Sequence, residues 1–242
     1  MNAPLVRRSP ARLGTVVGTR ELTPRMRRVT VHSDELIGVA VRPAQDVELL
    51  LREQTGRRVK RRYTIRSARP ETGEIDLDVL VHGRWPGSAW AADAAAGDAV
   101  EFQGPRGKLQ LVPAEWHLLV GDESALPAIA SICEALPETE AAIAVIEVGD
   151  ASDQLPVPAA QVQWVHRGSS SAGGAELLTA AIGGLDLPTG DGHGYLMGET
   201  RAMVTLRTVV EQRGIAHDAI FVKGYWNIGR PDRIAGRAPA TA

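Results

Sequence analysis

The chain has 242 residues, of which 44% are hydrophobic, so it is long and apolar enough to bury one large core or two smaller ones. It carries 27 basic and 29 acidic residues, a formal net charge of −2 that lacks the positive excess expected of a nucleic-acid-binding protein. Cys133 is the only cysteine, which excludes an intrachain disulfide, a cysteine-only zinc site and a protein-ligated iron–sulfur cluster.

The two ends of the chain lack a helical or strand period. Arginines in MNAPLVRRSPARLG interrupt the apolar segment that a signal peptide needs, and no run reaches the roughly 18 apolar residues of a membrane helix. We therefore expect a cytoplasmic location without membrane insertion. Residues 1–11 and 231–242, rich in Pro, Arg, Ala and Gly, are expected to be flexible tails.

Residues 12–113 are expected to form an antiparallel β-barrel. Six short β-like runs, separated by turn residues, fall at 12–22, 26–33, 46–53, 61–67, 74–83 and 98–105. In the fifth run Ile75, Leu77 and Val79 recur at strict period two, which is typical of a strand with one buried face. The alanine-rich segment 86–97 predicts a short helix that opens near Gly87 and Ser88. Six strands at this spacing predict a barrel.

Residues 114–230 change to an alternation of strands and helices. Strand-like runs fall at 116–120, 141–148, 162–166, 194–200 and 219–226, and helical runs at 127–136, 175–182 and 201–213. This alternation predicts a second, α/β domain with a parallel sheet, joined to the barrel near Pro113. Ligands are expected at the crevice between the domains, where the strand ends carry the polar loops GDES, MGET and KGYW.

The stretch RRYTIRS at 61–67 concentrates positive charge in a chain that is slightly acidic overall. On a strand, Arg61 and Tyr63 share one face and stand about 7 Å apart along the chain. A guanidinium that binds phosphate oxygens beside an aromatic ring suits a ligand with both a phosphate and a flat ring. The alternative is an exposed, charged edge strand with a half-buried tyrosine, and the spacing alone leaves both open.

The predicted short helix opens with small residues, Gly87, Ser88 and Ala89, followed by Trp90. Backbone N–H groups and the helix dipole at such a start attract an anion, although an ordinary capped surface helix has the same pattern. His82 ends the fifth strand, where its imidazole is placed to donate to a cofactor oxygen or to titrate near neutral pH. A solvated histidine at a strand end is the alternative.

Other chemistry finds little support in the sequence. The remaining histidines (His32, His117, His166, His193 and His217) show no metal-ligand spacing. The G-x-G-x-x-G, P-loop and G-x-S-x-G motifs are absent, and an aromatic content of 4% argues against a stacking surface for nucleic-acid bases. Cys133 lies on the apolar side of its helix and is expected to be a buried small hydrophobe rather than a nucleophile.

Seven motifs then follow one another in chain order. They are TPRMRRVTV at 23–31, R-x-Y-T at 61–64, LDVLVHG at 77–83, PGSAW at 86–90, GPRG at 104–107, LLVGDESALPAIA at 118–130 and KGYW at 223–226. In this order and spacing, over about residues 12–230, the chain resembles the siderophore-interacting protein family of ferric-siderophore reductases. The resemblance implies a ferredoxin-reductase-like architecture, in which an FAD-binding barrel precedes a nicotinamide-type α/β domain.

The resemblance also implies cofactor-binding roles. Tyr63 would lie against the isoalloxazine ring, with Arg61 and Thr64 on the same flavin-binding strand. Asp78, Leu80 and His82 would contact the cofactor from the neighbouring strand, and Gly87, Ser88, Ala89 and Trp90 would hold its pyrophosphate. At the crevice, Asp122, Glu123 and Ser124 match the family's GDE[ST] loop, while Tyr225 and Trp226 match a C-terminal aromatic pair near the flavin.

An anionic ferric chelate is the expected substrate. Arg57, Arg58 and Lys60 are predicted to attract it, with Lys108 and Lys223 as weaker candidates. Asn227 and Ile228 stand before Arg230, where family members commonly have arginines, so the nicotinamide contacts are left open. Ala89 also replaces a residue that is frequently larger and polar or basic, which backbone amides would compensate.

The implied activity is reduction of a ferric siderophore with release of Fe(II), by a monomer that takes electrons from NADH or NADPH. The flavin carries the redox chemistry, so no catalytic side chain and no resident metal are required. Two alternatives stay open: a reductase of the same architecture that acts on free flavin or a partner protein, and a siderophore-binding protein without redox activity.

Overall fold

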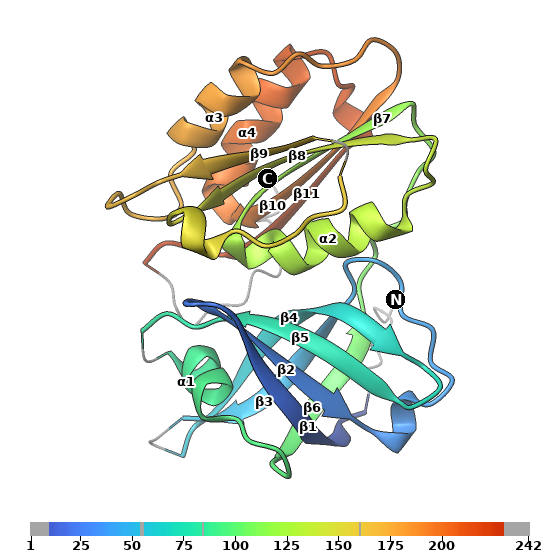
Figure 1. Ribbon diagram of the computed structural model, residues 1–242, viewed down its shortest axis with the longest axis vertical. Coiled ribbons are helices and arrows are strands. Elements are labelled where there is room, and N and C mark those ends of the chain that lie inside the picture. The colour runs from blue at the N-terminus through green and yellow to red at the C-terminus, as the bar shows by residue number, and fades with distance from the viewer. Residues whose placement is uncertain (1–9, 54–55, 84, 160, 230–242) are drawn as a thin grey trace, which may run out of the picture.

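The computed structural model describes residues 10–53, 56–83, 85–159 and 161–229, and Figure 1 shows a barrel and a parallel sheet on either side of helix α2. The predicted tails lie outside these ranges except for Pro10 and Ala11, and Arg230 lies outside them as well.

Six strands close the barrel. They are β1 (Arg12–Thr23), β2 (Met26–His32), β3 (Asp46–Arg52), β4 (Arg58–Arg69), β5 (Glu74–Leu80) and β6 (Ala99–Arg106), in the order β1-β2-β5-β4-β3-β6, with every neighbouring pair antiparallel. Alternate side chains point inward, as period two requires, so that Val31, Ile75 and Phe102 meet in one core. The predicted six-stranded antiparallel barrel is confirmed. A short 3₁₀ turn, η1 (Asp34–Leu36), follows β2.

Helix α1 (Pro86–Asp93) closes one end of the barrel and is shorter than the predicted segment 86–97. Ala94 leaves the helical conformation at φ −56° and ψ 130°, and its N–H still bonds to the Trp90 carbonyl. Gly97 then adopts a φ of +98°, a left-handed conformation that glycine allows, and its N–H bonds to the Val16 carbonyl of β1. The helix therefore ends where the chain turns back to the barrel.

The second half is a five-stranded parallel sheet. Its strands are β7 (Trp116–Asp122), β8 (Ala141–Val148), β9 (Gln161–His166), β10 (Gly192–Glu199) and β11 (Ile220–Trp226), in the order β11-β10-β7-β8-β9. Three short 3₁₀ turns accompany them: η2 (Glu123–Ala125), η3 (Ala151–Asp153) and η4 (His217–Ala219). The predicted parallel α/β sheet is confirmed.

Helices cover both faces of this sheet. Figure 1 shows α3 (Glu176–Gly183) and α4 (Thr200–Gln212) on the outer face, and α2 (Leu126–Ala135) on the face toward the barrel. Helix α4 buries Met203 and Leu206 at a helical spacing, which agrees with its amphipathic sequence. No helix within the described ranges has the length and apolar character that a bilayer-spanning helix needs.

Helix α2 ties the two halves together. Glu134 accepts two hydrogen bonds from Arg66 of β4, at 2.7 and 2.6 Å, and Ser131 accepts one from the Ala44 N–H at 3.1 Å. Leu80 and Met26 of the barrel pack into the same core as α2. The end of β5 is thereby held against the sheet. Strand β6 ends at Arg106 and β7 begins at Trp116, and a domain boundary near Pro113, between them, stays a prediction.

Candidate functional site

Arg61 and Tyr63 converge on the first turn of α1. A Cβ added to Gly87 would lie 1.7 Å from the Tyr63 hydroxyl oxygen, 3.0 Å from Tyr63 Cζ and 3.5 Å from Arg61 Cγ. Only a residue without a side chain leaves room there for the phenol. Strand β4 and the start of α1 therefore bring together the aliphatic stem of Arg61, an aromatic ring and a glycine backbone, while the Arg61 guanidinium donates to the Lys60 carbonyl at 2.9 Å.

The Tyr63 ring is held on one side and has an unused polar group. It stacks on Trp90, with ring centroids 6.2 Å apart and planes inclined by 29°. Burial raises the pKa of the Tyr63 phenol well above its ordinary value, against the opposing charge of Arg61. No group of the described residues forms a hydrogen bond with its hydroxyl. A ligand oxygen at the start of α1 could accept that bond, so this position fits a cofactor phosphate or ribityl group.

Ser88 fixes the start of α1 against the end of β5. Its hydroxyl accepts a hydrogen bond from the His82 N–H at 3.1 Å and donates one to the Leu80 carbonyl at 3.2 Å. The Ala89 N–H donates to the Trp85 carbonyl at 2.8 Å, so this amide is already bonded within the protein, and the predicted binding of an anion depends on the amides before it. Gly87 and Ser88 are the positions in α1 that suit a phosphate.

The neighbouring strand β5 has fewer side chains available to a cofactor than the sequence suggested. Arg28 of β2 donates to both carboxylate oxygens of Asp78, at 2.6 and 2.8 Å, and the Asp78 side chain is buried in this ion pair. Its predicted contact with the cofactor stays a prediction, and its side chain is already engaged by Arg28. Leu80 packs toward α2, and His82 is exposed just beyond the strand.

Strand β11 meets the barrel beside Tyr63. The Thr64 hydroxyl lies 3.5 Å from the Tyr225 hydroxyl, on the opposite side of β4 from the Tyr63 ring. Lys223 bonds to Asp46 of β3 at 3.0 Å and stands 5.0 Å from the centre of the Tyr225 ring. The carboxyl end of β11 thus contacts the predicted flavin strand.

The GDES loop is committed to partners within the protein. Asp122 is buried and accepts hydrogen bonds from the Ser124 N–H at 2.9 Å, the Glu199 N–H at 3.0 Å and the Trp226 indole at 2.8 Å. Burial raises the pKa of the Asp122 carboxyl, partly offset by hydrogen bonds from Ser124 and Trp226. Asp122 therefore fixes the Trp226 indole at the carboxyl ends of β7 and β11, and a contact of this loop with a cofactor stays a prediction.

Glu123 links the barrel to the sheet through a network that the sequence did not reveal. Arg167, after β9, donates to both of its oxygens at 2.8 and 2.7 Å, and Arg25, between β1 and β2, donates at 3.2 Å. Arg25 also pairs with buried Asp153 of η3. The TPRMRR motif contained Arg25, but partners 98 and 128 positions away leave no local pattern.

Glu147 lies at the edge of this network. Its carboxylate is 2% exposed and approaches Arg167 only to 3.8 Å. Burial raises the pKa of Glu147 to about 7, and the neighbouring charges of Asp122, Glu123 and Glu176 act in the same direction against the attraction of Arg167. The carboxyl ends of β7 and β8 therefore bury three neighbouring carboxyl groups, of Asp122, Glu123 and Glu147, and the pKa values of Asp122 and Glu147 are raised.

Most of the basic residues predicted to attract a chelate are paired with carboxylates. The pairs are Arg57 with Glu53 at 2.8 Å, Arg58 with Glu101 at 2.5 Å, Lys60 with Glu48 at 2.7 Å and Lys223 with Asp46 at 3.0 Å, while Lys108 is exposed. Arg106 joins them, at 2.6 Å from Glu48 and 3.3 Å from Asp46, and Arg62 lies 3.5 Å from Glu48. Arg58 and Lys60 also border a hollow of about 210 Å³ with Leu50 and Val59.

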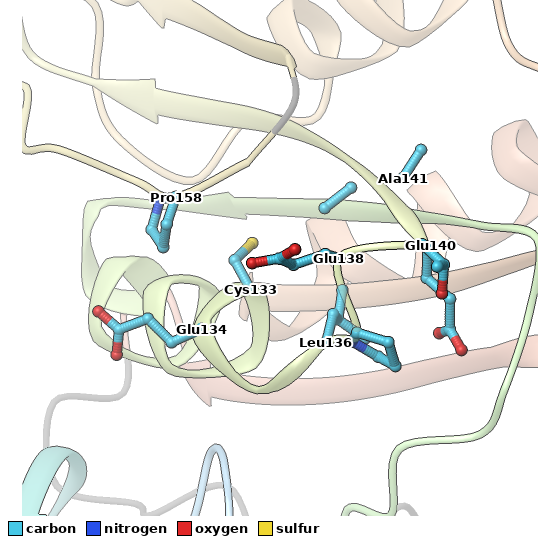
Figure 2. Close-up of a pocket in the computed structure, with 10 residues that line it drawn as sticks. Cys133, Glu134, Leu136, Glu138, Glu140, Ala141 and Pro158 are labelled. Atoms are coloured by element: carbon cyan, nitrogen blue, oxygen red, sulfur yellow. The ribbon is translucent and has the colours of Figure 1, made fainter.

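A larger pocket, of about 490 Å³, lies away from these residues (Figure 2). Cys133 and Glu134 of α2, Glu138 and Glu140 of the following loop and Pro158 line it, beside the amino end of β8. Cys133 is buried, and burial raises the pKa of its thiol to about 12, as expected of a packing residue. Since ligands of parallel sheets bind at the carboxyl ends, we do not assign the cofactor to this pocket.

The fold places the chain in a structural class. A barrel followed by a parallel α/β sheet also occurs in the flavohaemoglobin-like FAD/NAD-binding domain of a nitric oxide dioxygenase from Vibrio cholerae, which matches 91% of this chain and 100% of its own at a TM-score of 0.70. At 17% identity this likeness shows the ferredoxin-reductase-like architecture alone.

Family models assign the chain more closely. Residues 51–109 match the siderophore-interacting FAD-binding domain, and residues 114–229 match the siderophore-interacting protein model. The structure of a siderophore utilization protein from T. fusca is 31% identical and superposes at a TM-score of 0.82, over 91% of this chain and 94% of its own. The chain belongs to the siderophore-interacting protein family.

Two further proteins are similar to this chain. The siderophore-interacting protein SipS from Aeromonas hydrophila is 27% identical, with a TM-score of 0.78 over 91% of this chain and 93% of its own. The ferric vibriobactin reductase ViuB from Vibrio cholerae is 33% identical over 180 residues. That match covers 71% of this chain and 66% of ViuB, so the chain spans just under two thirds of this relative.

Proposed function

We propose that this protein is an FAD-dependent reductase that takes electrons from NADH or NADPH and reduces ferric siderophores, releasing Fe(II). The observation that carries the proposal is the convergence of Arg61 and Tyr63 on Gly87, within the segment that matches an FAD-binding domain. A relative with the printed name ferric vibriobactin reductase supports the choice of acceptor.

The residues at the start of α1 suit the two parts of a flavin dinucleotide. Tyr63 offers its ring to the isoalloxazine and its free hydroxyl to a ligand oxygen, and Trp90 holds the ring in place. The stem of Arg61 lies beside Gly87, and its guanidinium, which donates to the Lys60 carbonyl, would have to turn toward the pyrophosphate to bind it. The N–H groups of the first helical turn add a positive dipole end. Thr64 faces Tyr225 on the other side of the strand.

An FAD held by Tyr63, Gly87 and Ser88 would supply two-electron oxidation of a dihydronicotinamide and one-electron reduction of Fe(III). Each NADH or NADPH supplies two electrons and leaves as NAD⁺ or NADP⁺ with release of one proton, so two ferric chelates are reduced. Fe(II) binds hard oxygen ligands more weakly, which frees the metal. The residues of this chain would bind and orient the cofactor and the two substrates. Asp122 fixes the Trp226 indole, beside which NADH or NADPH is expected to bind.

In this proposal an anionic chelate is attracted by the net positive charge of a cluster of paired side chains on the barrel, not by unpaired lysines. Asp46 and Glu48 are surrounded by Lys60, Arg62, Arg106 and Lys223, which leaves two positive charges in excess at the barrel face next to Tyr225. Arg57, Arg58 and Lys108 are proposed to attract the anionic chelate toward this face by long-range electrostatic steering.

Anaerobic stopped-flow spectroscopy tests the proposal. The purified protein should show a flavin absorption band that bleaches with NADH or NADPH and returns on addition of hydroxamate or catecholate ferric chelates, while a ferrous chelator traps Fe(II). A protein that binds no added FAD would refute it. Bleaching without reoxidation by any chelate, but with turnover of free flavin, would favour a flavin reductase. Tight chelate binding without bleaching would favour a siderophore-binding protein.

The oligomeric state and the location are separate predictions of the sequence. We expect a monomer in light scattering at micromolar concentration, and fractionation should recover the protein from the cytoplasm.

A further inference from the structure

Two guanidiniums lie at the carboxyl ends of β8 and β9, and both are already bound by carboxylates. Arg167, directly after β9, is 9% exposed and donates to both oxygens of Glu123, at 2.8 and 2.7 Å. Arg25 donates to Glu123 at 3.2 Å and to Asp153 at 3.1 Å. A Cβ added to Gly149, which follows β8, would clash with Arg25 Nη2, so the Arg25 guanidinium lies against the end of this strand.

Carboxyl groups outnumber these guanidiniums at the same end of the sheet. The end of β7 supplies Asp122, the turn after it Glu123, the end of β8 Glu147, and the turn after β8 Asp150 and Asp153. Burial raises the pKa of Glu147 to about 7, and the charges of Asp122 and Glu123 act in the same direction. Five carboxyl groups beside two guanidiniums make this end of the sheet unfavourable for a further anion.

Asp150 is the exposed carboxylate of this group. It precedes the 3₁₀ turn η3, and its Oδ1 accepts the Ser152 N–H at 2.8 Å and the Ser152 hydroxyl at 2.6 Å. The bonds from Ser152 lower the pKa of Asp150, so the carboxylate is ionised at neutral pH. Among the described residues none bonds to its Oδ2, which leaves that oxygen to face a ligand.

A dinucleotide bound to an open parallel sheet lies across the carboxyl ends of the strands, at the point where the strand order reverses. In this sheet the order reverses between β7 and β10. An acidic residue after the second strand of such a sheet binds the adenosine ribose of NADH, whereas a nearby arginine accommodates the 2′-phosphate of NADPH. The second strand of this domain is β8, so Asp150 stands at the position that meets the 2′ group.

Two other basic side chains at this edge of the sheet do not supply a free cation for a 2′-phosphate. His166 ends β9, and the Gln154 amide donates to its Nε2 at 2.8 Å, which makes the imidazole a neutral acceptor in that bond. Arg201 is exposed in the first turn of α4, which follows β10. Strand β10 lies two strands from β8, about 10 Å across the sheet, so Arg201 belongs to the other side of the reversal point.

We propose that the donor site selects NADH over NADPH, because a 2′-phosphate would meet Asp150 and its neighbouring carboxyl groups instead of a free guanidinium. The inference rests on the proposed function, since it takes a nicotinamide dinucleotide as the donor and states which one. One unit charge about 4 Å from another changes an equilibrium in water roughly fivefold, and the 2′-phosphate adds nearly two charges. We therefore expect kcat/KM for NADH to exceed that for NADPH by at least about tenfold.

The test compares the two nucleotides by binding and by turnover. Isothermal titration of the FAD-loaded protein with NAD⁺ and NADP⁺ measures affinity without turnover, and anaerobic stopped-flow measures flavin bleaching by NADH and NADPH. Both are carried out for the wild type, Asp150→Asn, Glu123→Gln and the control Glu138→Gln. Asparagine can keep the bonds from Ser152 without the charge. Glu123→Gln leaves Arg167 with a neutral partner, and Glu138 is an exposed carboxylate beside the amino end of β8.

We expect NAD⁺ to bind the wild type more tightly than NADP⁺, and about 0.5 M NaCl to narrow the difference, because salt screens exposed charges. Asp150→Asn and Glu123→Gln should each raise kcat/KM for NADPH roughly fivefold. Glu138→Gln removes the same charge at the opposite end of the sheet and should keep the wild-type preference.

The outcomes separate this inference from the proposed function. Equal or better use of NADPH by the wild type would refute the inference and leave the proposed function standing. Bleaching by neither nucleotide in a protein that binds FAD would refute both. A preference for NADH that neither the variants nor salt change, or an equal loss with both nucleotides in the variants, would refute the assignment to these carboxylates. Thermal unfolding shows whether each variant is folded, and Asp150→Asn, which alters an exposed side chain, decides the question if Glu123→Gln is unstable.

Discussion

Gly87→Ala should disable the flavin site without removing any functional group. The new methyl carbon would stand 1.7 Å from the Tyr63 hydroxyl oxygen and 3.0 Å from Cζ, where nonbonded contact needs about 3.5 Å. The phenol must therefore move by nearly 2 Å, or α1 must shift away from β4. Either adjustment resembles overpacking, which costs about 1–3 kcal/mol.

We expect this strain to appear as a loss of FAD affinity. If Tyr63 leaves its position to accommodate the methyl group, the dissociation constant for FAD should rise roughly 5- to 150-fold. Fluorescence titration of the apoprotein with FAD measures it. Gly18→Ala is the matched control, because a Cβ there meets nothing within 4 Å. Wild-type affinity and an unchanged flavin spectrum in Gly87→Ala would show that Tyr63 does not lie against the cofactor.

Three further predictions concern the buried polar groups. A pKa of about 7 for Glu147, in place of 4.5, means that the folded state keeps a proton that the unfolded state releases, so the free energy of unfolding falls as pH rises from about 4.5 to about 7. Glu147→Gln should therefore be more stable than the wild type by at most about 3 kcal/mol at pH 8, and its free energy of unfolding in urea titrations should no longer fall over this pH range. An unchanged pH dependence would contradict the raised pKa of Glu147. Arg25→Ala leaves buried Asp153 without its guanidinium partner and should lower the free energy of unfolding by about 1–3 kcal/mol. Arg12→Ala, which breaks the ion pair with exposed Glu35, should lower it by less than about 1 kcal/mol. Equal urea midpoints for the two variants would argue that the Arg25 ion pairs do not stabilise the fold. Ser88→Ala removes the hydroxyl that bonds to Leu80 and His82, so it should lower the free energy of unfolding by about 1–2 kcal/mol and weaken FAD binding. Wild-type stability together with wild-type FAD affinity would show that these two hydrogen bonds are not needed.

The local sequence determined the elements and the shared face of two predicted site residues. Period two in β5, the alternation of strands and helices after Pro113, and the small residues at the start of α1 are short-range patterns, and all of these elements are found. Arg61 and Tyr63 were paired correctly on one side of β4, because side chains two positions apart on a strand share a face. The seven ordered motifs also led to the right family.

Tertiary structure decided which charged side chains are paired within the protein and which are available to bind a ligand. Asp78 is occupied by Arg28, and Lys60 by Glu48, across strand pairs whose register no local pattern contains. Arg25 and Glu123 meet across the two halves because α2 holds the barrel against the sheet. A sequence shows which side chains carry charge and which backbone periods repeat. Pairing of those charges depends on long-range packing, since two residues about 100 positions apart become neighbours only after the chain has folded.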